Sequence, residues 1–570
     1  DAVDIGEKIH VLLPELEQVD AMHAQYLRCV EPDLEPLYSC VLRFYSDFSD
    51  DTPMLAMLSL ALRAVQRGFV RQICRVMPPL SALGCRQLAA DAEYISSVAA
   101  AFVSTADSDF DVLLQCVLGR DQGQDDVEPP SELRTTLLDA LRSGRSAEPK
   151  RANAPVWTAR AESKQLAYVL LLGSMLRLGL LLLFPDLTQR WLAGRVELST
   201  PVTSFKRLAE GLHLSARGIS PYDGGVFHQS PLLLLVFRPL YYLPDAAMSV
   251  AFVAADALVA LGLAKLAGAR AAQLQRSTGT AVPGETRFIC RPSVAAMLYL
   301  FNPLAIATAL ARSTIVFSHA AIVGALYLGT QGLITGAVVC AAVATHLSLY
   351  PAMLIAPIAL MAGSGRGIVR TVIMFACTIG MLHVLFVAIY GAEYFAATVD
   401  FTVRVGDLQP TVGLFWYFFI EIFDEFRAFF IVVFQLTALA FAVPVAWRFR
   451  HDPLFAATML VGIISALKSY PAWGDLALFL GLLPVYEDLL KYLQYTFLSA
   501  NLLLYGIGLA PVFWYLWIEQ GSGNANFFYA ATLVYVFGQI ALLFDLGSAM
   551  LRRSLDIHHP ETRNRTVIQD

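Results

Sequence analysis

The chain has 570 residues, of which 56% are hydrophobic and only 15% are charged, and its formal net charge is −6. Soluble domains carry about 25% charged residues, so this composition excludes an ordinary soluble protein and indicates a multi-spanning membrane protein. Residues 1–150 hold 24 acidic and 13 basic residues, whereas the other 420 residues hold 23 acidic and 28 basic ones. We therefore expect an acidic, water-soluble segment followed by a lipid-embedded part, and no nucleic-acid partner.

Residues 1–120 follow a helical pattern that is interrupted by prolines. The clearest predicted helix covers residues 81–102, where apolar residues recur at spacings of three and four and form one face. That face needs a partner helix. We therefore predict a soluble helical segment here, without catalytic spacing among its residues.

Within this helix, Gln87, Leu88, Asp91 and Tyr94 resemble a run found in subunit seven of the conserved oligomeric Golgi complex, a vesicle-tethering complex. The resemblance implies a Golgi vesicle-tethering role for this segment. That family has no membrane domain, so a genuine fusion and a mis-joined gene remain alternatives. Residues 121–164 are rich in Pro, Ser, Gly and mixed charges and are predicted to be a linker.

The membrane part is predicted to cover residues 165–553. Residues 165–184 are apolar except for Arg177 and are long enough to cross a bilayer. Basic residues precede this stretch, so the positive-inside rule places the N-terminus in the cytoplasm and residues 185–230 on the lumenal side. Further apolar stretches follow, several of them too short to cross alone. We predict an all-α bundle of about 10 to 12 crossings with some broken or re-entrant helices, followed by a cytoplasmic tail at residues 554–570.

Residues 220–231 form a polar, turn-rich stretch that leads directly into an apolar segment, and we take it as the centre of the membrane part. Its prolines and glycines predict a loop at the membrane surface, and Pro231 suits the first turn of the helix that follows. Ser220, Tyr222, Phe227 and His228 supply hydroxyl, ring and imidazole groups at the depth of lipid head groups. We therefore expect this loop to handle a glycolipid.

Ionisable residues inside apolar stretches are costly and are functional candidates. Glu421, Asp424 and Glu425 fall at positions i, i+3 and i+4 of one predicted helix, with Arg427 close by. A network with Arg427, or a contact with a head group or a neighbouring subunit, is favoured over a catalytic acid pair. The other candidates of this kind are Arg177, Asp256, Lys468, Asp475 and Asp545.

Two aromatic or polar motifs accompany these charges. Residues 413–419 are rich in aromatic side chains, and Trp416 among them is either an interface anchor or a ring that stacks on acyl chains or sugars. Lys468, Tyr470 and Asp475 belong to a polar break between two short apolar pieces, which is typical of interrupted helices that line cavities.

Asn524 and Asn526 lie between two aromatic runs on the predicted lumenal side. Their amides can bind phosphate or sugar hydroxyls, because they donate and accept hydrogen bonds at once. A role in a tight turn is the alternative.

Together, residues 220–231, 413–421, 468–475 and 524–530 resemble the PIG-U family, the multi-spanning subunit of the glycosylphosphatidylinositol (GPI) transamidase. The similarity runs from residue 166 to residue 553. It implies an endoplasmic-reticulum membrane protein that binds the GPI glycolipid or the attachment signal, with the cysteine protease chemistry in another subunit of the complex. No catalytic residue, metal or cofactor is expected. The residues implied in lipid binding are Ser220, Tyr222, Phe227, His228, Trp416, Glu421, Lys468, Tyr470, Asp475, Asn524 and Asn526.

An enzyme is the alternative, because residues 220–234 also resemble the first GPI mannosyltransferase, which uses dolichol-phosphate-mannose. Such enzymes need a pair of acids in the first lumenal loop, one of them a general base. This chain has Glu197 there, but Val196 stands where the partner acid should be. We therefore predict the glycosyltransferase-like GT-C architecture with its catalysis lost and its lipid cavity kept. A transporter is a third option, which the lack of an obvious internal repeat disfavours.

Overall fold

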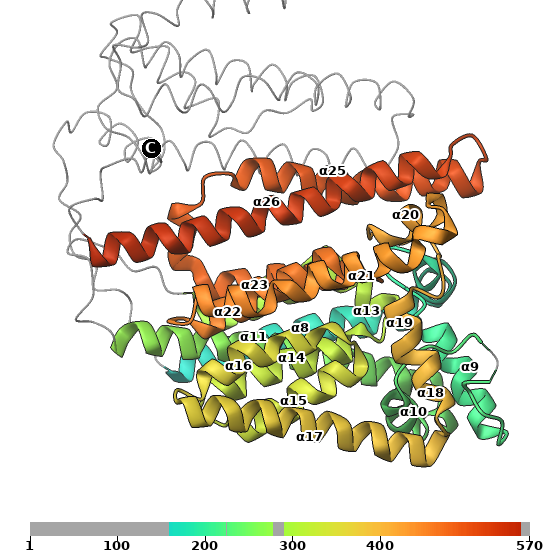
Figure 1. Cartoon of the computed structure of the whole chain (residues 1–570), viewed down its shortest axis with the longest axis horizontal. Helices are drawn as coiled ribbons and strands as arrows, with labels where there is room; N and C mark the ends of the chain where they lie inside the picture. Colours follow the sequence, from blue (N-terminus) through green and yellow to red (C-terminus); the bar gives the residue numbers. More distant parts are fainter. Residues whose placement is uncertain (1–158, 224, 277–289, 560–570) are drawn as a thin grey trace, which may run out of the picture. The chain divides into compact units, whose positions relative to one another are not determined.

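Helices alone build the part of the chain that the computed structural model describes, residues 159–223, 225–276 and 290–559 (Figure 1). Because no strand occurs within these ranges, the all-α prediction is confirmed. The expected tethering-like segment, most of the expected linker and most of the expected tail lie outside the described residues. The GT-C topology and the orientation in the membrane stay predictions.

The helices differ widely in length, from single turns to α26 with 34 residues. In chain order the α-helices are α8 (Ala159–Leu183), α9 (Phe205–Ala216), α10 (Pro231–Phe237), α11 (Asp245–Arg276), α12 (Pro292–Leu300), α13 (Pro303–Leu310), α14 (Ile315–Thr330), α15 (Ile334–Leu347), α16 (Ile355–Met361), α17 (Gly365–Tyr390), α18 (Glu393–Phe395), α19 (Phe401–Arg404), α20 (Phe415–Glu421), α21 (Asp424–Ala440), α22 (Ala442–Arg448), α23 (Pro453–Leu467), α24 (Trp473–Leu482), α25 (Thr496–Trp514) and α26 (Ala525–His558). Tighter or wider helical turns join them as η1 (Asp186–Trp191), η2 (Leu192–Gly194), η3 (Leu240–Tyr242), η5 (Tyr350–Leu354), η6 (Ala396–Asp400), η7 (Leu483–Tyr492) and η8 (Tyr515–Glu519).

Six of the described helical segments are long and apolar enough to cross a membrane, or seven if the bent pair α12 and α13 is one span. That pair bends by 58°, where Asn302 caps α13 and Pro303 begins it. Four shorter apolar helices of 10 to 17 residues accompany them. Broken helices were predicted, and the bent pair is one. The predicted number of 10 to 12 crossings depends on the shorter helices and stays a prediction.

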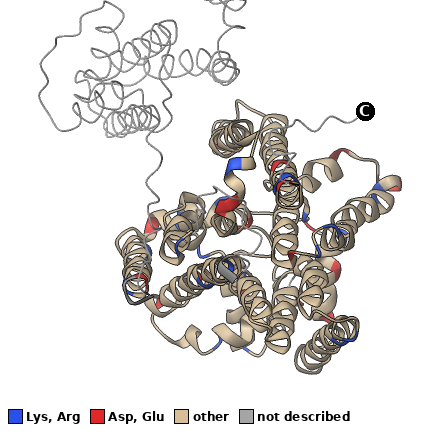
Figure 2. Cartoon of the chain, turned by 90° about the vertical axis from the view of Figure 1, so that its left-hand side faces the viewer, with Lys and Arg blue, Asp and Glu red and all other residues tan. Residues whose placement is uncertain are grey.

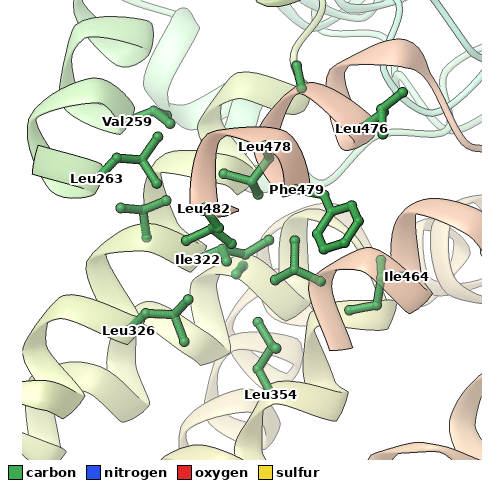
Figure 3. Packing of buried hydrophobic residues seen from close by; sticks show 14 of the residues in the cluster. Val259, Leu263, Ile322, Leu326, Leu354, Ile464, Leu476, Leu478, Phe479 and Leu482 are labelled. Carbon is green, nitrogen blue, oxygen red and sulfur yellow. The ribbon is translucent and has the colours of Figure 1, made fainter. Parts of the chain in front are cut away.

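The core lies where α11, α14, α23 and α24 meet (Figure 3). Leu263, Leu326, Ile464 and Phe479, one from each of these helices, are all almost completely buried. In α23 every residue from Leu454 to Ala466 is buried, as expected for a helix that is apolar on all sides and enclosed by others. The enclosed helix α23 leads directly into the polar break that begins at Lys468.

The long outer helices have the opposite character. In α17, which lies at the lower edge of Figure 1, only Thr371 and Phe386 are buried. Its exposed Val and Ile side chains suit contact with lipid. Figure 2 shows that few charged residues lie along the described helices.

Helices α25 and α26 lie side by side at the top of the coloured part of Figure 1 and approach closely at glycines. A Cβ atom on Gly506 would lie 2.7 Å from the Cα of Tyr535, and one on Gly538 would lie 3.0 Å from the backbone N of Leu503. Small residues allow such close packing of helices in membranes, where packing replaces the hydrophobic drive.

Three of the ionisable candidates are structural. Arg177 of α8 is fully buried and its Nε lies 2.5 Å from Asp256 Oδ2 of α11. Asp256 also accepts a 2.8 Å hydrogen bond from the hydroxyl of Tyr299. Asp545 of α26 accepts 2.9 Å hydrogen bonds from two successive backbone N–H groups just before α25. Each charge therefore has a partner that lowers the cost of its burial.

The expectation that Glu421, Asp424 and Glu425 share one helix is wrong. Helix α20 ends at Glu421, the next two residues have extended backbones with ψ of 147° and 141°, and α21 begins at Asp424. The three carboxylates are exposed, and Arg427 donates a 3.1 Å hydrogen bond to the carbonyl of Val405 instead. The predicted network with Arg427 therefore does not form.

Candidate functional site

A cavity of about 350 Å³ lies where the polar breaks of the sequence meet. It is bounded by the loop before α10, the ends of α14 and α15, the middle of α17, the segment α18 to α19, and the break between α23 and α24. In Figure 1 the short helices α10, α18 and α19 lie together at the right-hand end of the long helices. The polar side chains that line the cavity are mostly hydroxyls and imidazoles: Thr203, His228, Ser230, Thr314, Ser318, Thr345, His346, Ser348, Tyr350, His383, Tyr394, Thr398, Thr402, Lys468, Ser469 and Tyr470.

Two buried aromatic residues of the predicted loop at residues 220–231 anchor it to the protein. Tyr222 and Phe227 are buried with ring centroids 5.3 Å apart, and the Tyr222 hydroxyl donates a 3.1 Å hydrogen bond to the carbonyl of Gln229. Ser220 only receives a weak 3.4 Å hydrogen bond from the backbone N–H of Tyr222. These three predicted site residues therefore shape the loop and do not line the cavity.

His228 does line the cavity. Its Nδ1 donates a 2.9 Å hydrogen bond to the carbonyl of Ala397, and its ring stacks on Phe401 with centroids 3.6 Å apart and an interplanar angle of 6°. The ring of Tyr470 also stacks on that of Phe401, with the two centroids 5.7 Å apart. Burial lowers the pKa of His228 below its ordinary value, and nearby Arg207 acts in the same direction.

Lys468 and Asp475 form a buried ion pair at the predicted polar break. The Lys468 Nζ donates to Asp475 Oδ1 at 2.6 Å, and the two side chains are 5% and 8% exposed. Asp475 Oδ2 accepts a 2.9 Å hydrogen bond from the backbone N–H of Ala472, which caps α24. Tyr470 is held by a 2.8 Å hydrogen bond from its hydroxyl to the carbonyl of Asp407. Lys468 and Tyr470 line the cavity, whereas Asp475 is not part of the lining and contacts it only through Lys468.

Two histidines of the cavity wall, His346 and His383, were missed by the sequence analysis. The Nδ1 of His346 lies 2.6 Å from Ser230 Oγ, and the Nδ1 of His383 lies 2.6 Å from the Tyr394 hydroxyl. The two imidazole centroids are 5.1 Å apart. The signal was available, because a histidine inside an apolar stretch is as much a candidate as an acid or a lysine.

Trp416, Asn524 and Asn526 belong to a separate aromatic cluster outside the cavity lining. The Tyr417 hydroxyl donates to Asn526 Oδ1, and the rings of Tyr417 and Tyr529 stack with centroids 4.5 Å apart. Asn524 Oδ1 accepts a 3.1 Å hydrogen bond from the backbone N–H of Asn526 and caps α26. The Asn524 side chain therefore acts as a helix cap, and a contact of either amide with phosphate or sugar stays a prediction. Trp416 is buried, and both asparagines are exposed.

Helix α20 connects this cluster to the cavity. On one side Phe415 and Phe419 pack with Tyr470, and on the other Trp416 packs with Phe528 of α26. The motif at residues 413–421 therefore places its aromatic rings against two other motifs. Glu421 ends this helix in an exposed position, away from the residues that line the cavity.

Comparison with known proteins accounts for this arrangement of motifs. The sequence model described as "GPI transamidase subunit PIG-U" matches residues 171–535. The chain belongs to the PIG-U family. A relative from Cricetulus griseus, GPI-anchor transamidase component PIGU, is 33% identical over 428 residues, which cover 69% of this chain and 95% of the relative.

Two further members of the PIG-U family show the same extent of similarity. GPI transamidase component GAB1 from Saccharomyces cerevisiae is 35% identical over 386 residues, covering 67% of this chain and 93% of the relative. GPI-anchor transamidase component PIGU from Homo sapiens is 33% identical over 411 residues, covering 66% and 92%. The resemblance predicted from the four motifs is therefore confirmed, whereas the tethering resemblance of residues 84–94 stays a prediction.

Within this PIG-U family member, the one acid at the predicted mannosyltransferase position is already engaged. Glu197 is 1% exposed, and its two oxygens accept hydrogen bonds of 2.6 and 3.1 Å from Arg195. Its backbone carbonyl accepts a 2.9 Å hydrogen bond from the backbone N–H of Trp473. This carboxylate is therefore buried and held by the guanidinium, not exposed to an acceptor hydroxyl. The mannosyltransferase alternative is therefore not favoured.

Proposed function

We propose that this protein is the subunit of a GPI transamidase that binds the GPI glycolipid and presents it to a partner subunit, without making or breaking bonds itself. The observation that carries the proposal is the cavity, which brings residues 228–230 and 468–470 together from opposite parts of the sequence. The polar end of the glycolipid would occupy the cavity, and its acyl chains would lie against the apolar outer helices.

The chemistry of the cavity suits a carbohydrate better than an ion. Hydroxyls and imidazoles donate and accept hydrogen bonds, as sugar hydroxyls do. The one ammonium group in the described lining, that of Lys468, is already paired with Asp475. Apolar side chains such as Leu233 and Ile379 complete the wall, and a mostly apolar pocket with a few placed polar groups is typical of small-molecule sites.

The residue types that line the cavity support the proposed accessory role. Among the described residues that line the cavity there is no cysteine and no carboxylate. A cysteine protease subunit of the same complex is the proposed partner, and the endoplasmic-reticulum membrane is the proposed location. Binding the glycolipid beside another subunit's acyl-enzyme would raise the effective concentration of its amine, an effect that can supply about 7–11 kcal/mol of the barrier.

The test uses a GPI precursor with a photoactivatable group on its polar end, applied to the assembled complex. Ile379→Trp places a large ring at the cavity wall, and Ile373→Trp makes the same change at an exposed site of the same helix. We expect Ile379→Trp to reduce crosslinking to this subunit and anchor attachment in cells, and Ile373→Trp to leave both unchanged. Equal crosslinking in the two variants would contradict binding in the cavity.

The aromatic cluster offers a second arm of the test, because Asn524 and Asn526 stay proposed contacts of the head group. Asn526→Lys removes the acceptor of the Tyr417 hydroxyl and adds a charge. We expect Asn526→Lys to reduce GPI capture, because its exposed amide is a proposed contact of the head group. If Asn524→Lys and Asn526→Lys both preserve GPI capture and anchor attachment, these two residues are structural only.

A further inference from the structure

Ser230 connects the loop to the cavity wall through two hydrogen bonds. Its Oγ accepts a 3.2 Å hydrogen bond from the backbone N–H of Leu232, which caps α10. The same Oγ lies 2.6 Å from Nδ1 of His346, 116 positions later in the sequence. Within the described ranges, His346 Nδ1 is the acceptor that the structure offers to the Ser230 hydroxyl hydrogen.

The direction of this hydrogen bond sets the tautomer of His346. If Ser230 donates to Nδ1, the neutral imidazole carries its hydrogen on Nε2. That Nε2 is buried and has no hydrogen-bond partner among the described residues, although His346 lines the cavity. A buried donor without an acceptor is costly, and few occur in folded proteins without a reason.

We infer that His346 is a ligand-positioning residue that donates a hydrogen bond from Nε2 to a hydroxyl oxygen of a sugar or inositol ring in the cavity. The inference rests on the proposed function and specifies it: the cavity recognises the uncharged ring of the head group and not its phosphate. A neutral imidazole supplies one directed donor, whereas phosphate binding normally recruits an unpaired arginine or lysine. The nearby cation, Lys468, is neutralised by Asp475 at 2.6 Å.

Two substitutions separate the two faces of this imidazole. His346→Asn keeps an amide near the position of Nδ1, so the contact with Ser230 survives and the cavity donor is lost. His346→Gln places its amide near the position of Nε2, so the cavity donor survives. Crosslinking of the photoactivatable GPI precursor to the assembled complex is measured for both. We expect a loss of roughly tenfold for His346→Asn and of less than about threefold for His346→Gln.

A competition experiment distinguishes ring from phosphate. Unlabelled phosphatidylinositol and phosphatidic acid carry a phosphate on the same lipid, but only the first carries the ring. We expect phosphatidylinositol to compete with the probe on the unmodified complex, and His346→Asn to weaken that competition. Phosphatidic acid should compete poorly with the probe, both on the unmodified complex and on His346→Asn. Equal competition by phosphatidic acid would show that phosphate is recognised and would overturn the inference.

The outcomes for the two proposals are separable. If the unmodified complex is not labelled at the cavity, the proposed function fails. If it is labelled and His346→Asn is labelled equally, only the role of His346 fails. Co-purification of the other subunits with each variant shows whether folding and assembly are intact, and rescue by His346→Gln excludes a merely structural loss.

Discussion

Neutralising Asp475 is expected to destabilise the protein strongly, because it leaves the charge of Lys468 buried. The two side chains are 5% and 8% exposed and 2.6 Å apart, so water cannot replace the lost partner. Breaking such a buried pair from one side costs about 3–5 kcal/mol. In Asp475→Asn the amide oxygen can still accept the hydrogen bond from Ala472 that caps α24, so the loss reports the charge and not the cap.

The measurement is the thermal stability of the purified protein at a constant detergent concentration. Size-exclusion chromatography after heating gives the fraction that stays folded. The matched control is Asp186→Asn, which also removes an ion pair, but one whose side chains with Arg190 are 82% and 85% exposed. Pairs of that kind contribute about 0–1 kcal/mol. The control is therefore expected to be close to the unmodified protein.

A second variant tests the reason for the loss. Lys468→Met combined with Asp475→Asn removes the uncompensated charge, and replacing a buried pair by uncharged groups is often close to neutral. We expect the double variant to recover most of the stability. The reasoning is refuted if Asp475→Asn is no less stable than Asp186→Asn, or if the double variant is as unstable as the single one.

Two further predictions follow from the described contacts. Gly506→Ala should destabilise the α25 and α26 pair by about 1–3 kcal/mol, because its Cβ would lie 2.7 Å from Tyr535 Cα, whereas Gly508→Ala has nothing within 4 Å of its Cβ and should be tolerated; equal melting temperatures would contradict this. Because burial lowers the pKa of His228, its imidazole binds a proton less readily in the folded state than in the unfolded state. The contribution of His228 to stability should therefore be constant above about pH 6.5 and fall at lower pH. The difference in melting temperature between the unmodified protein and His228→Gln, measured from pH 7.5 to 5.5, checks this, and an increase of that difference toward acid would contradict it.

The parts of the site that sequence predicted are those where a local pattern decides the structure. Lys468 and Asp475 could be recognised because a polar run between two apolar pieces breaks a helix. The loop before Pro231 could be recognised because proline favours the first turn of a helix. Both predictions needed only neighbouring residues.

The parts that sequence missed depend on distant contacts. The break between Glu421 and Asp424 has no Pro or Gly to announce it, so the spacing of the carboxylates suggested a continuous helix. His346 gains its meaning from Ser230, which lies 116 positions away. Asn524 and Asn526 belong to the same predicted lipid-binding set as the cavity residues, but the contact of Asn526 with Tyr417 places the pair in the aromatic cluster. Only packing in three dimensions decides such pairings.

The buried pair between Arg177 and Asp256 has a consequence for how the chain is made. Arg177 lies in α8 and leaves the ribosome 79 positions before Asp256, so α8 is synthesised with an arginine that has no counter-charge. A lone arginine costs about 2.5–3.5 kcal/mol at the centre of a membrane helix and less toward its ends, and Arg177 lies toward the C-terminal end of α8. Helix α8 would therefore wait at the insertion machinery until α11 arrives, and the two helices would leave it together. The 2.5 Å contact between them therefore predicts that α8 and α11 enter the membrane as a pair.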